Sequence, residues 1–168
     1  MISLAEAVKL KSILNKKTQE LISEIHSNSH SIVEKGEQPK QPDRTLSIIE
    51  AELVRVRKDA RLLDKLIYKA NIENTIQFKD EQLTLVEAIE LAIQLRSQVS
   101  LYQDLGRSDK EEFYHSSGEA ILYRIALYDP TEYRNQANEL EKEAHRLSNA
   151  INAKNYQVQI EFDDSNYF

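Results

Sequence analysis

Two histidines spaced four residues apart are the first candidates for chemistry in this sequence. His26 and His30 lie in the stretch HSNSH, and on an α-helix this spacing places both imidazoles on one face, as metal sites often do. The stretch lacks the glutamate of the HExxH metalloprotease pattern, and two side chains alone do not complete a metal site. We therefore interpret the pair as a polar helix end, with metal binding at His26 and His30 as the alternative hypothesis.

Other catalytic patterns are missing from the chain or lie in the wrong place. Glu112 and His115 have the Glu-x-x-His spacing of metal sites in helical bundles, but they fall between predicted helices. Three scattered glycines do not form a phosphate-binding loop, no G-x-S-x-G elbow occurs, and the absence of cysteine excludes a thiolate nucleophile. The sequence therefore predicts no catalytic residue and no cofactor, and it favours a protein that is not an enzyme.

Net charge and hydropathy argue against a nucleic-acid-binding protein and against a membrane-spanning one. The 168 residues carry a net charge of -6 with a pI near 5.3, whereas proteins that bind a nucleic-acid backbone have clustered lysine and arginine. No run reaches the roughly 18 to 20 apolar residues of a membrane-spanning helix, and the first residues, MISLAEAVKLK, lack the pattern of a signal peptide. We expect a cytoplasmic protein with no membrane span and no nucleic-acid partner.

Two short phrases with the same pattern predict an internal repeat. SLAEAVKL begins at Ser3 and TLVEAIEL begins at Thr84, and in each the hydroxyl residue is followed three positions later by a glutamate, Glu6 or Glu87. This is the pattern of a capping box, which satisfies the free backbone amides at the start of a helix. Apolar positions after the two phrases match at an offset of 81 residues: Leu4, Ala7, Leu14 and Leu21 correspond to Leu85, Ala88, Leu95 and Tyr102.

A second pair of segments repeats at an offset of 84 residues. Apolar side chains recur at alternating spacings of four and three residues, as on a helix that packs along another helix. Both segments then pass into alternating stretches, at 72–78 and 156–162, which predict short strands that pair with each other as an edge ribbon. The apolar positions are Ile49, Leu53, Val56, Ala60, Leu63 and Ile67, and Tyr133, Ala137, Leu140, Ala144, Leu147 and Ile151.

These repeats predict a mainly α protein, built as a duplicated helical hairpin that forms an antiparallel four-helix bundle with coiled-coil seams. One domain of residues 1–168 is expected, with repeat units at 3–79 and 84–163 and a short β insertion at about 106–130 in the second unit. The helices are expected at about 4–30, 46–71, 85–104 and 131–155.

Asn71 and Asn155 are polar residues at equivalent places near the ends of the second and fourth predicted helices. An asparagine at a helix C-terminus often adopts the left-handed conformation and ends the helix, which is our first interpretation. Because the repeat relates the two residues, a second interpretation is that they face each other and bind a small ligand.

The insertion carries the sequence's clearest indication of an interaction surface. A run at 119–128 alternates in the manner of a strand and ends at an Asp-Pro breaker. A lone strand leaves its backbone groups without partners, so we expect it to pair with one of the extended tails or with a second subunit. The aromatic residues near it indicate either packing of the loop on the helices or an aromatic-rich interface. The predicted interface residues are Ile121, Tyr123, Ile125 and Leu127.

Several landmarks, taken in order, resemble those of a known family. LAEAVKL, VEKGEQPKQP, LIYKAN, TLVEAIEL and LSNAINAKNY are similar to the landmarks of the septicolysin-like family of small bacterial helical proteins, over nearly the whole chain. The resemblance implies a helical fold with a β-containing insertion in the second half. The family name also implies a thiol-activated cytolysin, whereas this chain has no cysteine to activate. The family's insertion carries an arginine close to a Ser-Glu pair, where this chain reads Ser116, Ser117, Gly118 and Glu119, and no catalytic residue is carried over.

Three functions are therefore hypotheses at this level. The first is a non-enzymatic, homo-oligomeric assembly or interaction protein of the bacterial cytoplasm, and the insertion strand provides its interface. The second is a metal- or small-ligand-binding protein, or an enzyme, with a site between subunits. The third is a membrane-active, cytolysin-like protein, as the resemblance implies.

Overall fold

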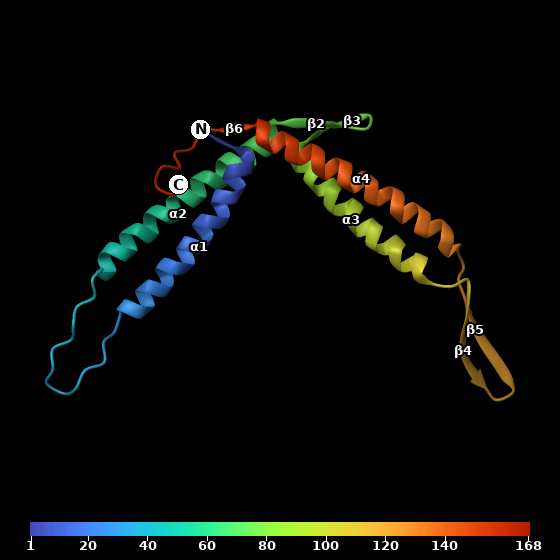
Figure 1. Cartoon of the computed structure of the whole chain (residues 1–168), viewed down its shortest axis with the longest axis horizontal. Coiled ribbons are helices and arrows are strands. Elements are labelled where there is room, and N and C mark those ends of the chain that lie inside the picture. Colours follow the sequence, from blue (N-terminus) through green and yellow to red (C-terminus); the bar gives the residue numbers. More distant parts are fainter. The chain divides into compact units, whose positions relative to one another are not determined.

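A computed structural model describes residues 1–168 and is mainly helical. Three antiparallel strand pairs accompany the helices (Figure 1). The chain divides into two compact units, one of Met1–Asn74 with Asn155–Phe168 and the other of Thr75–Lys154. The helices are α1 (Leu4–Asn28), α2 (Leu46–Glu73), α3 (Leu85–Arg107) and α4 (Pro130–Gln157).

The two predicted capping boxes are confirmed at the starts of α1 and α3. The amide of Ser3 donates to Glu6 Oε2 at 2.7 Å, and the amide of Glu6 donates back to Ser3 Oγ at 3.2 Å. Thr84 and Glu87 make the same pair of hydrogen bonds, at 2.8 and 3.3 Å. The hydrogen bonds from Ser3 lower the pKa of Glu6, and those from Thr84 lower the pKa of Glu87. Both helices therefore begin at the residues that the repeated phrases indicated.

In the first unit, α1 and α2 lie side by side and run in opposite directions (Figure 1). The apolar positions predicted from helical spacing form its core, and Leu4, Leu14, Ile49 and Leu63 are fully buried. A short strand pair stands at the start of α1, where β1 (Ile2–Ser3) pairs with β6 (Gln159–Ile160). Burial of the apolar seam, worth roughly 1.5–3 kcal/mol for each large side chain, is the main stabilising term of this helix pair.

Near the loop between α1 and α2, ion pairs connect the two helices to that loop. Glu52 on α2 accepts from Lys17 on α1 at 2.9 Å and also from Arg44, which in turn reaches Glu24 at 3.0 Å. The hydrogen bond from Lys17, followed by that from Arg44, lowers the pKa of Glu52. Residues 29–45 are otherwise largely exposed, as their polar sequence predicted.

In the second unit, α3 and α4 form the other helix pair (Figure 1). Arg96 Nη2 donates to Ser148 Oγ at 2.6 Å, and the rings of Tyr102 and Tyr133 meet edge to face with centroids 5.0 Å apart. The buried apolar residues of the pair are Leu85, Ala88, Ala92, Leu95, Val99, Ala137, Ala144, Leu147 and Ile151. The joining of the two pairs into a four-helix bundle remains a prediction.

The expectation that the two extended tails pair with each other was wrong. The tail after α2 forms β2 (Thr75–Phe78), which pairs with β3 (Glu81–Thr84) directly before α3. The turn between them contains Lys79 in the left-handed region, with φ of 50°. A tight turn brings the neighbouring segment to β2 at little cost in chain entropy, and the distant tail pairs with β1 instead.

Candidate interaction surface

The insertion between α3 and α4 is an antiparallel β-hairpin. Its strands are β4 (Glu111–Ser117) and β5 (Ala120–Ile125), and the turn contains Gly118 with a positive φ of 64°, which favours glycine. The prediction of a strand at 119–128 is confirmed for its central part. The expectation that this strand pairs with one of the tails was wrong, because β4 is its partner within the chain; pairing with a second subunit stays a prediction. Leu127 lies beyond the end of β5 and is not part of the strand's row.

The register of the hairpin separates its two faces. Phe113 stands opposite Tyr123, and Ile125 stands opposite Glu111, so alternate residues of β5 share one face with Phe113. The opposite face carries the ion pair between Arg124 and Glu112, at 2.7 Å. We call the first face the apolar face and define it as Phe113, Ile121, Tyr123 and Ile125.

The apolar face is exposed along its whole length. Phe113, Ile121, Tyr123 and Ile125 have exposed fractions of 65%, 60%, 53% and 57%. Isolated apolar residues are common on protein surfaces, whereas a contiguous exposed row is a candidate site of interaction. The structure therefore places three of the four predicted interface residues together on one strand, and it adds Phe113 from β4.

The base of the hairpin, in contrast, is firmly attached to the helices. Tyr128 Oη donates to the carbonyl of Leu105 at 2.9 Å, and the Tyr128 ring meets that of Tyr133 edge to face at 5.3 Å. Lys110 Nζ donates to the carbonyls of Ala126 and Tyr128, at 2.8 and 2.9 Å. The Tyr128 contacts hold the hairpin at the ends of α3 and α4, and the Lys110 hydrogen bonds join the two ends of the hairpin to each other. The hairpin is thus anchored at its base while its apolar face stays exposed.

The two histidines do not both lie on helix α1, as a metal-binding pair at helical spacing would. His26 lies in the last turn of α1, whereas His30 follows the C-terminal end of the helix, and its Nδ1 lies 2.8 Å from Ser29 Oγ. The regular spacing that would align the two imidazoles ends at Asn28. No group of three or more His, Cys, Asp or Glu side chains is arranged to hold a metal ion.

Asn71 and Asn155 do not end their helices in a left-handed conformation. Both lie within helical segments, and the only positive-φ residues of the chain are Gly36, Lys79 and Gly118. The side-chain oxygens of both asparagines are buried and accept no hydrogen bond. A buried acceptor without a donor is unusual and costs roughly 1–3 kcal/mol, so the two amides remain candidates for a ligand contact.

Fold and surface define a class: a mainly helical protein with small antiparallel strand pairs, one of which presents an exposed apolar face. The chain belongs to DUF6847, a family of unknown function whose model matches residues 11–160. The resemblance to septicolysin-like proteins is a separate prediction.

A crystal structure of a functionally unknown conserved protein from Corynebacterium diphtheriae has the same fold, with a TM-score of 0.67 at 23% sequence identity. The similarity covers 95% of this chain and 99% of that one. None of the curated proteins matches the sequence. No helix has both the length and the apolar character that crossing a bilayer demands.

Proposed function

We propose that this chain is a non-enzymatic, cytoplasmic assembly protein, and that copies of it associate through the apolar face of the hairpin. The observation that carries the proposal is the contrast between an anchored base and an exposed apolar row on β4 and β5. Burying a large apolar side chain contributes about 1.5–3 kcal/mol, whereas association costs roughly 4–15 kcal/mol in lost freedom. Four such side chains, together with the apolar residues of a complementary surface, contribute a free energy of the same order as that cost.

Native mass spectrometry and light scattering test this proposal directly. The wild-type protein is expected as an oligomer, with a mass that is a multiple of 19.5 kDa. Ile125→Asp places a charge in the apolar face and is expected to shift the mass to that of a monomer, with unchanged helix content by circular dichroism. The matched control is Ile93→Asp, because Ile93 has a similar exposed fraction of 54% but lies on α3. A monomeric wild type, or an Ile125→Asp variant that stays oligomeric, would overturn the proposal.

The same chain is also proposed to be a duplication of one helical hairpin. Three observations support this: the two capping boxes, the bounds of α2 and α4, which differ by 84 residues at both ends, and the strand registers. Ser3 pairs with Gln159 as Thr84 pairs with Thr75, and these partners are equivalent under the offsets of 81 and 84 residues. Two such repeats would form the four-helix bundle about a pseudo-twofold axis. Small-angle X-ray scattering tests the bundle, since a radius of gyration well above that of a compact chain contradicts it.

A second candidate function is the binding of a small hydrogen-bond donor at the two asparagines, and their unpartnered buried oxygens favour it. Native mass spectra of protein purified without denaturation would then contain an extra mass that Asn71→Leu and Asn155→Leu both remove. Without a ligand, the same substitutions delete an unsatisfied acceptor and are expected to leave the free energy of unfolding unchanged or higher. A wild-type spectrum with no extra mass counts against this function.

A further inference from the structure

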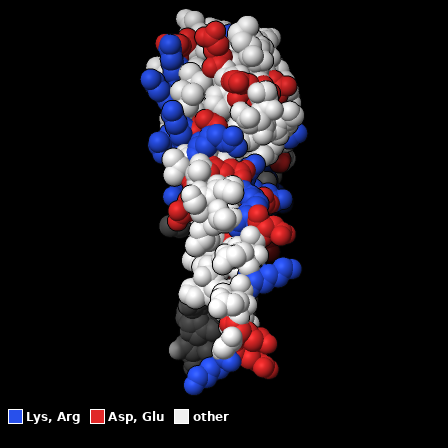
Figure 2. Space-filling model, turned by 90° about the vertical axis from the view of Figure 1, so that its left-hand side faces the viewer, with Lys and Arg blue, Asp and Glu red and all other residues white.

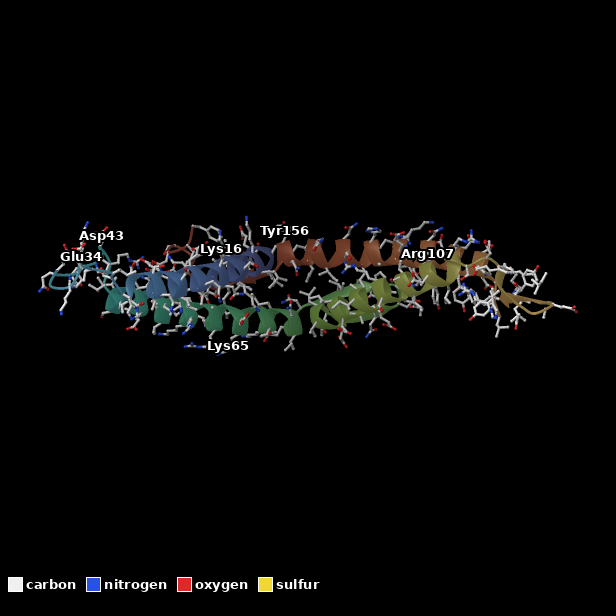
Figure 3. All side chains as sticks on the ribbon, turned by 90° about the horizontal axis from the view of Figure 1, so that it is seen from below. Lys16, Glu34, Asp43, Lys65, Arg107 and Tyr156 are labelled. Atoms are coloured by element: carbon white, nitrogen blue, oxygen red, sulfur yellow. The ribbon has the colours of Figure 1, made fainter.

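The outer face of α2 carries a row of basic side chains. After two adjacent residues at 57 and 58 they recur every three or four residues, which places them on the side of the helix away from the buried seam of Ile49, Val56 and Ile67. Lys65, for example, points away from α1 (Figure 3), and Figure 2 shows Lys and Arg side chains gathered in a row along one margin. We define the basic face as Arg57, Lys58, Arg61, Lys65 and Lys69, all of which are exposed.

The positive charge of this face is not neutralised within the chain. Residues 55–69 contain six basic and two acidic side chains. Both acids are engaged elsewhere, since Asp59 accepts from Tyr167 Oη at 2.5 Å and Asp64 pairs with Lys11 at 2.5 Å. Within the basic face, an ion pair is formed only by Lys69, with Glu73 at 3.8 Å. A chain with a net charge of -6 therefore keeps a cationic stripe on one helix in which four of the five basic side chains form no ion pair.

Apolar side chains flank the stripe. Leu62 and Tyr68 have exposed fractions of 48% and 62%, and Val54 at the start of the stripe is 66% exposed. A helix face that combines apolar side chains with one sign of charge fits a partner with an apolar centre and the opposite charge around it. The surface that complements this stripe is thus acidic and contains apolar residues.

The hairpin of the same chain has that chemistry. Residues 108–129 contain five acidic and two basic side chains. Both basic groups are occupied, Lys110 by the carbonyls at the hairpin base and Arg124 by Glu112. Glu111, which stands opposite Ile125, and Glu119 in the turn make no ion pair. A glutamate without an ion pair therefore stands at each end of the apolar face.

We propose that the apolar face of one copy docks on the basic face of α2 of a second copy. This inference rests on the proposed function and names the surface that covers the hairpin. Packing two hairpins against each other would instead bring two acidic segments together, and like charges facing each other across an interface disfavour association. Contact with α2 pairs Glu111 and Glu119 with lysine and arginine, and it covers the apolar residues on both sides.

Charge reversal on each side tests the contact separately. The α2 variant is Lys58→Glu with Arg61→Glu and Lys65→Glu, and the hairpin variant is Glu111→Lys with Glu119→Lys. In each variant alone, the hairpin and the α2 face carry charges of the same sign and repel each other at the contact. The dissociation constant of each variant, measured by sedimentation velocity, is therefore expected to rise about tenfold or more. An equimolar mixture of the two variants pairs opposite charges again and is expected to recover association.

The control variant is Lys9→Glu with Lys35→Glu and Lys40→Glu, which changes the same number of exposed charges outside the basic face. It is expected to associate like the wild type. If the α2 variant also associates like the wild type while Ile125→Asp is monomeric, the docking on α2 is wrong and the assembly function stands. If the mixture does not recover association, the pairing of these two surfaces is likewise overturned. A monomeric wild-type protein contradicts the assembly function itself.

Discussion

The rings of Phe113 and Tyr123 face each other across the two strands of the hairpin, edge to face with centroids 6.3 Å apart. Both side chains are more than half exposed, so the pair stabilises the hairpin from its outer side rather than from a core. An aromatic pair opposite each other on neighbouring strands contributes roughly 0.2–1 kcal/mol relative to alanine. This contact therefore helps to order the apolar face within the single chain.

Phe113→Ala is accordingly expected to loosen the hairpin. The amide of Ala126, which donates to the Lys110 carbonyl at 2.9 Å, is a suitable reporter. We expect its hydrogen exchange to accelerate severalfold, with unchanged exchange in α1 and α2. Tyr114→Ala is the control, because Tyr114 lies at the irregularity between Phe113 and His115, where no residue stands opposite it. Equal acceleration in both variants would contradict a specific role for the Phe113 ring.

Gly106 allows α3 and α4 to approach closely near the base of the hairpin. A Cβ atom at this position would lie 2.6 Å from Arg134 Cγ and 3.1 Å from the Arg134 backbone nitrogen. Gly106→Ala is therefore expected to lower the free energy of unfolding by about 1 kcal/mol or more, because overpacking outweighs the better helix propensity of alanine. Chemical denaturation measures the change.

The double variant Gly106→Ala with Arg134→Ala separates the side-chain clash from the backbone contact. Removing Arg134 Cγ is expected to restore part of the lost stability, while Arg134→Ala alone has a small effect because Arg134 is exposed. A Gly106→Ala variant more stable than the wild type would show that the helices separate at no cost.

Most of the helical fold could be predicted from local sequence patterns. The capping boxes at Ser3 and Thr84 depend on residues three positions apart, so they were readable without tertiary information. The seam from Ile49 to Ile67 was readable for the same reason, because burial follows the helical period. Asp129-Pro130 was interpreted as a breaker, and it marks the start of α4, where Asp129 Oδ1 accepts from the amide of Thr131 at 2.9 Å.

The pairing of the strands could not be predicted from local patterns. β4 reads EEFYHSS, in which polar residues and an irregular register hide the alternation that identifies a strand. β3 was hidden because its last residue, Thr84, also caps α3. The sequence therefore predicted the strand that carries Ile121, Tyr123 and Ile125, but it did not predict β4 as the backbone partner of that strand.

Glu52 is expected to make the α1–α2 pair sensitive to acid. Its pKa is lowered in the folded chain by hydrogen bonds from Lys17 and Arg44, relative to an ordinary value of 4.5. A depressed carboxyl pKa contributes stability that is present above the ordinary value and is lost as pH falls through the folded one. Thermal unfolding followed at pH values from 7 down to 3 is thus expected to show a falling midpoint below about pH 4.5.

Glu52→Gln removes the charge at every pH, so this variant is expected to be less stable than the wild type at neutral pH and less dependent on pH in the acid range. Glu50→Gln is the control on the same helix, because Glu50 is exposed and forms no ion pair. The assignment fails if the wild type and Glu52→Gln lose stability in parallel between pH 5 and pH 3.

Tyr167 attaches the end of the chain to α2 and is expected to titrate apart from the other tyrosines. Burial, followed by the hydrogen bond from its hydroxyl to Asp59, raises the pKa of Tyr167 to about 12. A raised pKa favours the protonated form in the folded chain, so the contribution to stability is complete below pH 10 and is lost as pH rises through about 12. The end of the chain is therefore expected to detach from α2 in strongly alkaline solution.

Ultraviolet absorbance of tyrosinate follows this step, because the chain has eight tyrosines and one of them is expected to ionise near pH 12. Tyr167→Phe should remove that late component and leave the remaining titration unchanged. Tyr156→Phe is the matched control, since Tyr156 is 71% exposed and hydrogen-bonds to no side chain that would hold its hydroxyl. A late component that persists in Tyr167→Phe would show that another tyrosine ionises last, and that the contact with Asp59 does not govern the alkaline transition.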